Sequence, residues 1–446
     1  MKRTGMRAGI VLIALLASGL PFLVIDNSRL AADWNHDFNA ATQQTATANA
    51  GSIAGPRPGL NARSEGLIFN IKSSPYSASM NGSDDTNAID QAQKDARAVG
   101  GTVYIPPGVA VYSGHLTGVS ISGAGPGISV LRRKTGNKGV LVDLSPRIGL
   151  SITDLTIDGN ASGNSANTAP DVALGTNCLM QRVEVRNCPF MCIQAVGTHI
   201  EILDSTLIGP NRRGLGAQYG IWAADTATTL LIRGCTIRGM RLAGIFGSGA
   251  RTRIEASAIY RNHWEVSPTG GGQIAFRNDG RNITITGNLI STGGGPLTSG
   301  IEMDAPDALI VGNTIEGQPN YGVIFQAAQG GSAIGNSISA CGNAAIRVDS
   351  GASNVSLVGN MLRGSSTLIS DTGIGTQKIA NQPAQYLLLP GYASIPASST
   401  TSRQPQMYVK GDKIVIQYND EGTIRYLSMN ARQSVRTAWV SSTIPP

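Results

Sequence analysis

The chain has 446 residues, of which 56 are glycine, while 14% are charged and 5% are aromatic. This composition excludes a helical protein and favours a single elongated β domain with appendages. The formal net charge is +7, but no lysine or arginine run is interleaved with aromatic residues, which argues against nucleic acid as a partner.

The N-terminus has the pattern of an export signal. Lys2, Arg3 and Arg7 precede an apolar stretch from Ala8 to Ile25, as in a secretory signal peptide. We expect residues 1–32 to be this signal. The alternative is an uncleaved anchor, since a stretch of 18 residues is borderline for spanning a bilayer, and it is the only predicted contact with a membrane. Either reading places the protein outside the cytoplasm: secreted, periplasmic or at the cell surface. Residues 33–66, rich in small and polar residues, are predicted to be a linker.

The stretch Asn81–Tyr112 reads "NGSDDTNAIDQAQKDARAVGGTVYIPPGVAVY". Asp84, Asp85 or Thr86 can cap a helix that runs to about Ala98. Its apolar residues would cover the open end of a stack of β-strands, which otherwise exposes unpaired backbone groups: Ala88, Ile89, Ala92, Ala96 and Val99.

A repeat occupies the region from Thr198 to Gly373. The most regular repeat units each begin with an Asn, at spacings of 25, 23 and 24 residues: Asn288, Asn313, Asn336 and Asn360. The register continues backwards, less regularly, through Ser257, Cys235, Ser205, Arg182 and Asp154. Periods in the low twenties with β alternation predict a solenoid of parallel strands. We expect each Asn to hydrogen-bond its amide to the next coil. An antiparallel sandwich is the alternative, but its turns would not recur in a constant register.

The opening stretch resembles that of the pectate-lyase-like superfamily of right-handed parallel β-helices. In that superfamily Asp-Asp-Thr leads a short helix, and Gly-Gly-Thr-Val-Tyr with a Pro-Pro-Gly turn starts the first coil. Residues Ser122–Arg133 extend the resemblance, which covers residues 67–373. It implies this fold and favours a polysaccharide ligand, since the superfamily includes lyases, glycoside hydrolases, sugar epimerases, tailspike-like depolymerases and non-catalytic members. Fold alone does not choose among them.

Aligning one strand of each coil on its inward Ile predicts two outward columns. The first contains Gln194, Trp222, Phe246, Ala275, Glu302, Ile324 and Arg347. The second contains Val196, Ala224, Ser248, Arg277, Asp304, Gln326 and Asp349. Charged residues therefore gather in a few coils, with Glu302 and Asp304 about 7 Å apart on one strand face. Arg277 should lie one coil below Asp304, and Arg347 two coils above Glu302.

This cluster allows two chemistries. Paired carboxylates can hydrolyse a glycosidic bond as acid and base or as acid and nucleophile. Alternatively, Glu302 and Asp304 hold Ca²⁺ against the carboxylate of a uronate sugar while a basic residue removes a proton for β-elimination. The competing interpretation is a solvated face with ordinary ion pairs.

Two irregular coils carry extra loops just before the aligned strand. They bring Arg212, Arg213, His263, Trp264 and Glu265 toward Trp222, Arg277 and Glu302, with Tyr219 at the end of the first loop. Insertions in solenoids usually mark the binding face. Trp222, Trp264 and Tyr219 can stack on a sugar, and His263 is a candidate acid or base.

The remaining features constrain the function only loosely. Five cysteines are too few for a disulfide framework; Cys188 and Cys192 could form one bridge, and most are expected to be small buried residues. Residues 374–403 are predicted to be a linker. Residues 404–446 alternate as a β-meander, with two strands around a turn at Asn419–Gly422, which either caps the last coil or makes subunit contacts in a homo-oligomer.

The sequence therefore predicts an exported parallel β-helix acting on an acidic polysaccharide, with a lyase slightly ahead of a glycoside hydrolase. The alternative class is a carbohydrate-binding or envelope-structural protein without catalysis. The chain lacks the site motifs of polygalacturonases, alginate epimerases and classical pectate lyases, so no catalytic residue carries over from these families. The predicted catalytic residues are Glu302, Asp304, Arg277 and His263. The predicted substrate-binding residues are Trp222, Trp264, Tyr219, Arg212, Arg347, Asp349 and Gln326. Glu302 and Asp304 are also the predicted Ca²⁺ ligands.

Overall fold

A computed structural model describes residues 67–209, 217–263, 271–277 and 280–381, together with the strand backbones within 406–410, 413–420, 423–430 and 440–442. The predicted signal peptide, the linker at 33–66 and the linker residues from 382 onward lie outside the described residues. The chain divides into two compact units, one spanning Arg63–Leu387 and the other including the C-terminal strands.

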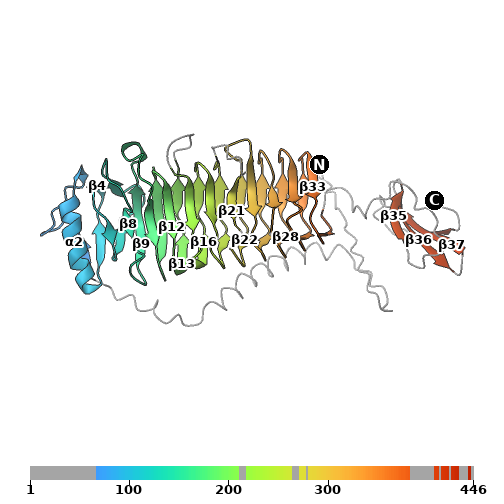
Figure 1. Ribbon diagram of the computed structural model, residues 1–446, viewed down its shortest axis with the longest axis horizontal. Coiled ribbons are helices and arrows are strands. Elements are labelled where there is room, and N and C mark those ends of the chain that lie inside the picture. The colour runs from blue at the N-terminus through green and yellow to red at the C-terminus, as the bar shows by residue number, and fades with distance from the viewer. Residues whose placement is uncertain are drawn as a thin grey trace, which may run out of the picture. The chain divides into compact units, whose positions relative to one another are not determined.

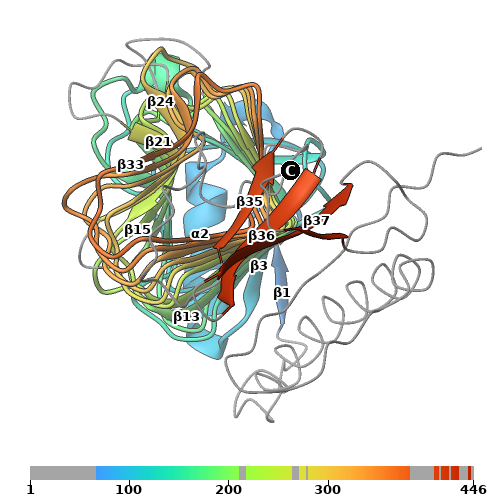
Figure 2. The same ribbon diagram turned by 90° about the vertical axis from the view of Figure 1, so that its right-hand side faces the viewer.

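The first unit is a parallel β-solenoid in which each coil pairs with the next (Figure 1). One wall is an 11-stranded parallel sheet. Its strands are β5 (Leu116–Thr117), β8 (Val142–Asp143), β10 (Pro170–Leu174), β12 (Met191–Ala195), β15 (Tyr219–Ala223), β18 (Ala243–Gly247), β21 (Gly271–Phe276), β24 (Thr298–Met303), β27 (Val323–Phe325), β30 (Ala344–Val348) and β33 (Thr367–Asp371). Figure 2, viewed along the solenoid, shows β15, β21, β24 and β33 stacked on one side.

The other walls belong to a 23-stranded sheet that consists of two rows. The long strands β9 (Ser151–Asp158) and β11 (Leu179–Arg186) belong to both rows. The first row also contains β1 (Ile68–Asn70), β3 (Thr102–Ile105), β6 (Ser120–Gly123), β13 (Thr198–Leu203), β16 (Thr228–Arg233), β19 (Arg253–Glu255), β22 (Thr284–Thr286), β25 (Leu309–Val311), β28 (Ser332–Ile334), β31 (Ser356–Val358) and β34 (Gln377–Ile379). The second contains β2 (Asn81–Asp84), β4 (Gly108–Tyr112), β7 (Ser129–Arg133), β14 (Thr206–Ile208), β17 (Thr236–Arg238), β20 (Ala258–Tyr260), β23 (Leu289–Ser291), β26 (Thr314–Glu316), β29 (Ser337–Ser339) and β32 (Met361–Arg363).

The core fills the bore of the solenoid. Each strand alternates faces, so one apolar side chain per short strand points inward, and equivalent positions stack from coil to coil. Ile245, Ile274, Ile301, Val323 and Ile346 form one fully buried stack along the 11-stranded sheet. Burying each such side chain contributes about 1.5–3 kcal/mol, which makes these stacks the main source of stability.

A ladder of amide side chains lines one turn of the solenoid. The Oδ1 atom of Asn313 accepts from both the backbone N–H and the side-chain Nδ2 of Asn288, each at 3.0 Å. The same pair of bonds recurs between later coils and ends at Asn381. Each Asn also donates to a carbonyl of the preceding coil, as Asn313 does to Ile285 O at 2.8 Å. The predicted hydrogen bonding of the Asn repeat is therefore confirmed, and it satisfies backbone groups that would otherwise be buried without partners.

The predicted register is off by one residue at the two earliest positions. The residue before each ladder position has a left-handed backbone, as Gly287 (φ 63°) does before Asn288. Arg182 (φ 51°) and Asp154 (φ 60°) occupy this preceding position, because Glu184 pairs with Thr206 and so Val183 aligns with Ser205. Their side chains form a largely exposed ion pair, with Arg182 Nε 2.6 Å from Asp154 Oδ1.

Helix α2 (Thr86–Val99) lies at the end of the solenoid that contains β1 and β3, and it contacts both strands (Figure 1). Its buried face consists of Ala88, Ile89, Ala92 and Ala96. Val99, which we expected on this face, is 58% exposed because it ends the helix. Asp85 is the N-cap residue but makes no capping bond; its carboxylate accepts from Ser79 and Met80 instead. Within the described residues no helix is long and apolar enough to cross a membrane.

The strands extend beyond the predicted end of the solenoid at Gly373, because β34 still pairs with β31. In the second unit, β35 (Gln406–Lys410), β36 (Lys413–Asp420), β37 (Thr423–Asn430) and β38 (Val440–Ser442) form an antiparallel sheet. Strands β36 and β37 make the expected hairpin, with Asp420 paired to Thr423.

Candidate functional site

The outer face of the 11-stranded sheet carries the predicted columns in the predicted register. Strand pairing aligns Gln194, Trp222, Phe246, Ala275, Glu302, Ile324 and Arg347 residue by residue. The backbone N–H groups of Arg277, Asp304, Gln326 and Asp349 each donate to the preceding coil at the adjacent position, which forms the second column. Solenoid geometry therefore brings together residues from distant repeats.

Arg277 connects the two central carboxylates. Its Nη1 atom lies 3.1 Å from Glu302 Oε1 and 2.9 Å from Asp304 Oδ2. Because both contacts share one nitrogen, these two oxygens are at most about 6.0 Å apart. No hydrogen bond or ion pair joins Nε or Nη2 of Arg277 to a described residue, and the side chain is 36% exposed. Nη1 thus holds the carboxylates, while Nε and Nη2 remain without a hydrogen-bond partner among the described residues.

The carboxylates are more buried than the sequence predicts. Glu302 is 1% exposed and Asp304 is 8% exposed, although both were expected to point outward from their strand. Glu302 lies between Ala275 and Ile324 in its column, and both of these are buried too. Burial raises the pKa of Glu302, and the attraction of Arg277 and a hydrogen bond from Gln326 only partly oppose it. The Oδ1 atom of Asp304 is buried without a hydrogen-bond partner, which leaves one acceptor for a donor that is not part of the described chain.

An aromatic cluster adjoins this triad. The rings of Tyr219 and Phe246 stack with centroids 4.8 Å apart, and Trp222 lies 5.9 Å from Tyr219. The guanidinium of Arg277 sits over Phe246, 5.6 Å from the ring centre. The half-exposed aromatic rings therefore adjoin the buried carboxylate pair through Arg277, and a sugar ring can stack on them.

Arg347 and Asp349 form a separate cluster two strands further along. Arg347 pairs with Asp349 and donates to the hydroxyl of Tyr321, and its guanidinium lies 4.9 Å from the Tyr321 ring centre. The strand spacing of about 4.8 Å places this cluster roughly 10 Å from Glu302 along the axis. The predicted set is thus divided into two groups on one face, with Gln326 against Glu302.

The structure contradicts the expectation that His263 is an accessible loop residue. It is 1% exposed, its Nδ1 lies 3.0 Å from Thr298 Oγ1, and its Nε2 has no hydrogen-bond partner. A side chain at Gly271 would come within 2.7 Å of Nε2, so the ring is packed against that strand. Burial lowers the pKa of His263 to about 4, so the ring is neutral at neutral pH. Its position suits packing rather than proton transfer.

Other predicted residues lie outside the described residues: Trp264, Arg212, Arg213 and Glu265. Sequence reasoning left two contributors out of the site. Phe246 was aligned in the column but not chosen, and Tyr321 was missed. The sequence does contain a signal that could have identified Tyr321. Tyr-Gly precedes an apolar residue in both "YGIW" and "YGVI", and Tyr219 and Tyr321 occupy equivalent positions in their coils.

The donor set does not fit a calcium site. Calcium takes six to eight oxygen ligands, whereas the carboxylate oxygens of Glu302 and Asp304 that face each other already accept from Arg277. No cluster of three or more acidic, His or Cys side chains suited to a metal occurs among the described residues. The positive charge that the structure places against both carboxylates is the guanidinium of Arg277.

Comparison with known proteins supports the fold. Residues 192–362 match the family described as "Right handed beta helix region". The Dettilon tailspike protein has 11% identity and a TM-score of 0.54, covering 81% of this chain and 78% of its own. The Streptococcus pneumoniae surface protein and adhesin PfbA has 11% identity and a TM-score of 0.52, covering 71% and 98%. The A-module of the Azotobacter vinelandii mannuronan C-5 epimerase AlgE6 has 20% identity and a TM-score of 0.48, covering 70% and 100%.

A comparison with curated protein sequences finds no match. The family match, the likeness to solved structures and the continuous parallel pairing of the coils agree on the architecture. The chain is a right-handed parallel β-helix protein.

Proposed function

We propose that this protein is an exported enzyme that cleaves glycosidic bonds in an acidic polysaccharide, with Glu302 and Asp304 as its carboxyl pair. The observation that carries the proposal is the contact of one Arg277 nitrogen with both carboxylates beside a half-exposed aromatic cluster. The resemblance of the opening coil to a superfamily of polysaccharide-active proteins supports the same substrate class.

The carboxyl spacing favours hydrolysis with retention of configuration. Retaining glycosidases hold their carboxyl groups about 5–5.5 Å apart, and inverting enzymes about 6.5–9.5 Å. The upper limit of about 6.0 Å between the Glu302 and Asp304 oxygens falls on the retaining side. Glu302, whose pKa is raised, donates its proton to the glycosidic oxygen as that bond breaks. Asp304 attacks the anomeric carbon, and water later releases the sugar while Glu302 recovers a proton from it.

Arg277 supports an acidic substrate. Its Nε and Nη2 have no partner among the described residues, so its free edge can bind a uronate carboxylate while Nη1 remains on the protein carboxylates. Tyr219, Trp222 and Phe246 offer a stacking surface one to two coils before the carboxyl pair, in line with a sugar chain that lies along the solenoid axis.

The same exposed edge of Arg277 favours a second candidate, a lyase. Neutralising a uronate carboxylate is the first requirement of β-elimination, because charge develops next to it when the neighbouring proton leaves. The products distinguish the two reactions: a lyase creates unsaturated ends that absorb ultraviolet light, whereas a hydrolase creates reducing ends without that absorbance.

The test is to incubate the protein with polygalacturonate, alginate and hyaluronan and to measure both products. Glu302→Gln should lower the rate by at least about 100-fold, the usual effect of losing a general acid. Glu316→Gln is the matched control, since Glu316 is an exposed glutamate on β26 and should leave the rate unchanged. Full activity of the Glu302→Gln protein would refute the role of the pair. Glycan binding without either product, in the wild type, would show a non-catalytic carbohydrate-binding protein.

A further inference from the structure

A second polar site lies closer than the carboxyl pair to the end of the solenoid that α2 contacts. A cavity of about 610 Å³ opens at the edge where β7, β9 and β11 end. We name it the coil-edge cavity and define it by Arg132, Thr135, Asp158, Asn160, Ser162 and Asn187. Its volume falls within the range of typical ligand sites, about 300–1,000 Å³.

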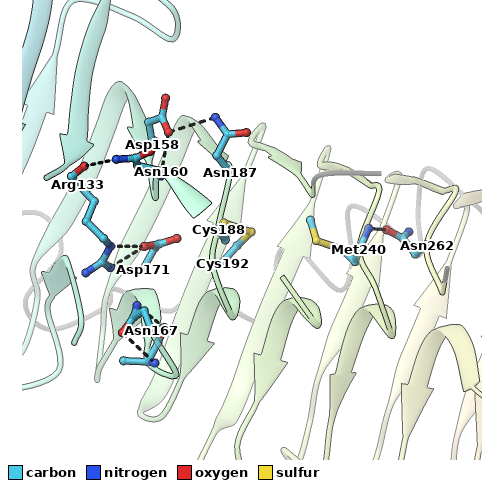
Figure 3. Close-up of a disulfide and its surroundings, with 11 residues drawn as sticks. Arg133, Asp158, Asn160, Asn167, Asp171, Asn187, Cys188, Cys192, Met240 and Asn262 are labelled. Atoms are coloured by element: carbon cyan, nitrogen blue, oxygen red, sulfur yellow. Dashed lines mark hydrogen bonds and ion pairs between the residues drawn. A yellow bond between two sulfur atoms is a disulfide. The ribbon is translucent and has the colours of Figure 1, made fainter. Parts of the chain in front are cut away.

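Asp158 is the central group of this cavity. The register stacks Arg132, Asp158 and Arg186 on consecutive strands. Asp158 Oδ2 lies 3.5 Å from Arg132 Nε and 3.3 Å from Arg186 Nε. Its Oδ1 accepts from Asn187 Nδ2 and from the backbone N–H of Asn160, both at 3.1 Å. Figure 3 shows Asp158, Asn160 and Asn187 gathered at this edge. The carboxylate is fully partnered, so its role is to hold the surrounding groups in place.

These contacts leave one face of the cavity with unused hydrogen-bonding capacity. Arg132 is held through Nε alone, its side chain is 40% exposed, and its two Nη groups have no partner among the described residues. Asn187 uses its Nδ2 on Asp158 and leaves its amide oxygen as an acceptor. The hydroxyls of Thr135 and Ser162 line the same space. A guanidinium held in place can bind a carboxylate through its two free N–H groups, which form a fork. The donors and acceptors around it can hydrogen-bond to sugar hydroxyls.

Of the other two cations in the lining, Lys134 pairs with Asp84 at 2.6 Å and Arg133 belongs to the core. Arg133, the neighbour of Arg132, points to the opposite side of its strand and pairs with Asp171 at 2.6 Å, where both side chains are fully buried (Figure 3). That pair supports the floor, while Arg132 points outward. Alternation along β7 thus separates a structural arginine from one that faces the cavity.

One row of paired strands runs from the coil of the cavity to the coil that carries the carboxyl pair. Asp158 aligns in succession with Arg186, Ile208, Arg238, Tyr260 and Ser291. Ser291 ends the strand that precedes β24, which carries Glu302. Five strand spacings of about 4.8 Å place the cavity roughly 24 Å from the carboxyl pair along the axis. Arg238 and Tyr260 are half-exposed on the intervening coils.

We propose that the coil-edge cavity binds an acidic sugar residue, with the Arg132 fork on the sugar carboxylate and Thr135, Ser162 and Asn187 on its hydroxyls. This inference rests on the proposed function in one respect, namely that the sugar belongs to the same polymer that is cleaved at Glu302 and Asp304. A chain long enough to reach both regions is held at two points, whereas a short oligomer occupies only one. The cavity is therefore an anchoring site that favours long chains.

The test measures binding separately from cleavage. In the full-length Glu302→Gln protein, calorimetry gives the affinity for long polygalacturonate and alginate chains. Arg132→Met should weaken that affinity about tenfold or more, because a charge-assisted contact is lost. Ser162→Trp should have the same effect by filling the mouth of the cavity, and Ser162 is exposed, so the fold tolerates the change. Arg281→Met, at an exposed arginine elsewhere on the solenoid, should have no effect.

Kinetics on the active protein complete the test. Arg132→Met should raise the KM for long chains about tenfold with kcat unchanged, and should leave the turnover of short oligomers unchanged. Unchanged affinity in both cavity variants would overturn the proposal, as would an equal loss in Arg281→Met, which would indicate general charge attraction. If no substrate is cleaved but Arg132→Met still weakens binding, the anchoring site stands and the proposed function falls.

Discussion

The coils from Ser129 to Cys192 and those from Asn288 to Asn381 share the same strand pairing but are stabilised by different means. The later coils repeat one device, an Asn whose amide connects three successive coils. The earlier coils have no such ladder. They contain instead the buried Arg133–Asp171 pair, the Asp158 carboxylate with its several hydrogen-bond and ion-pair partners, and the Cys188–Cys192 disulfide. Figure 3 shows these groups within a few neighbouring coils.

The difference teaches that the two regions satisfy their buried polar groups by different means. A repeated ladder satisfies one turn of each regular coil with a single residue, while Glu302 and Asp304 lie on another wall of the same coils. The irregular coils hold ionisable groups in place with specific partners, and some atoms remain without one. Asp171 Oδ2 is such an atom, and burial raises the pKa of Asp171 to about 7 although Arg133 opposes the shift.

The largest expected effect is in the irregular coils. Arg133→Met should lower the free energy of unfolding by about 3–5 kcal/mol, because Asp171 loses the partner of its buried carboxylate. Denaturant titration measures the change. The double variant Arg133→Met with Asp171→Leu should recover much of the loss, since replacing a whole buried pair by apolar groups is often neutral. A loss below about 1 kcal/mol in the single variant would show that the pair contributes little.

The regular coils should respond less, and in a graded way. Asn336→Ala removes the acceptor of two Asn313 donors and two donors of its own, and should cost about 2–4 kcal/mol. Asn288→Ser should cost only about 1 kcal/mol, because Ser257 already fills the equivalent position one coil earlier and its hydroxyl accepts from Cys235 N. Equal losses in the two variants would contradict the idea that one accepting oxygen is the essential feature of the ladder.

The smallest expected effect is a pH dependence at the carboxyl pair. The pKa of Glu302 is raised in the folded protein, so its contribution to stability is fully present below the ordinary glutamate pKa of about 4.3 and is lost as the pH rises through the folded value. Each unit of the shift corresponds to about 1.4 kcal/mol. The stability of the wild type should therefore fall relative to Glu302→Gln as the pH increases from 4 toward neutrality. The opposite trend in denaturant titrations would mean that Arg277 dominates over burial.

Much of this architecture can be predicted from the spacing of residues in the sequence. The Asn repeat predicts the solenoid, and alignment on Ile193, Ile221, Ile245 and their successors predicts the outward columns in the correct register. The pairing of Arg277 with Glu302 and Asp304 follows from that register. Periodicity succeeds here because every coil obeys the same geometric rule.

The spacing could not predict how deeply each side chain is buried. Glu302 lies in an outward column yet is buried, because exposure depends on neighbouring side chains and not on strand alternation. His263 was read as a loop residue, whereas packing against Gly271 and Thr298 encloses it. The coil-edge cavity escaped notice because its residues come from three coils whose lengths differ, so no period marks them.

The left-handed residue before each ladder position has a consequence for how such a protein can change its size. Since every turn closes in the same way, one complete coil can be gained or lost without disturbing the pairing of its neighbours. The distance between the coil-edge cavity and the Glu302–Asp304 pair would then change in steps of about 4.8 Å.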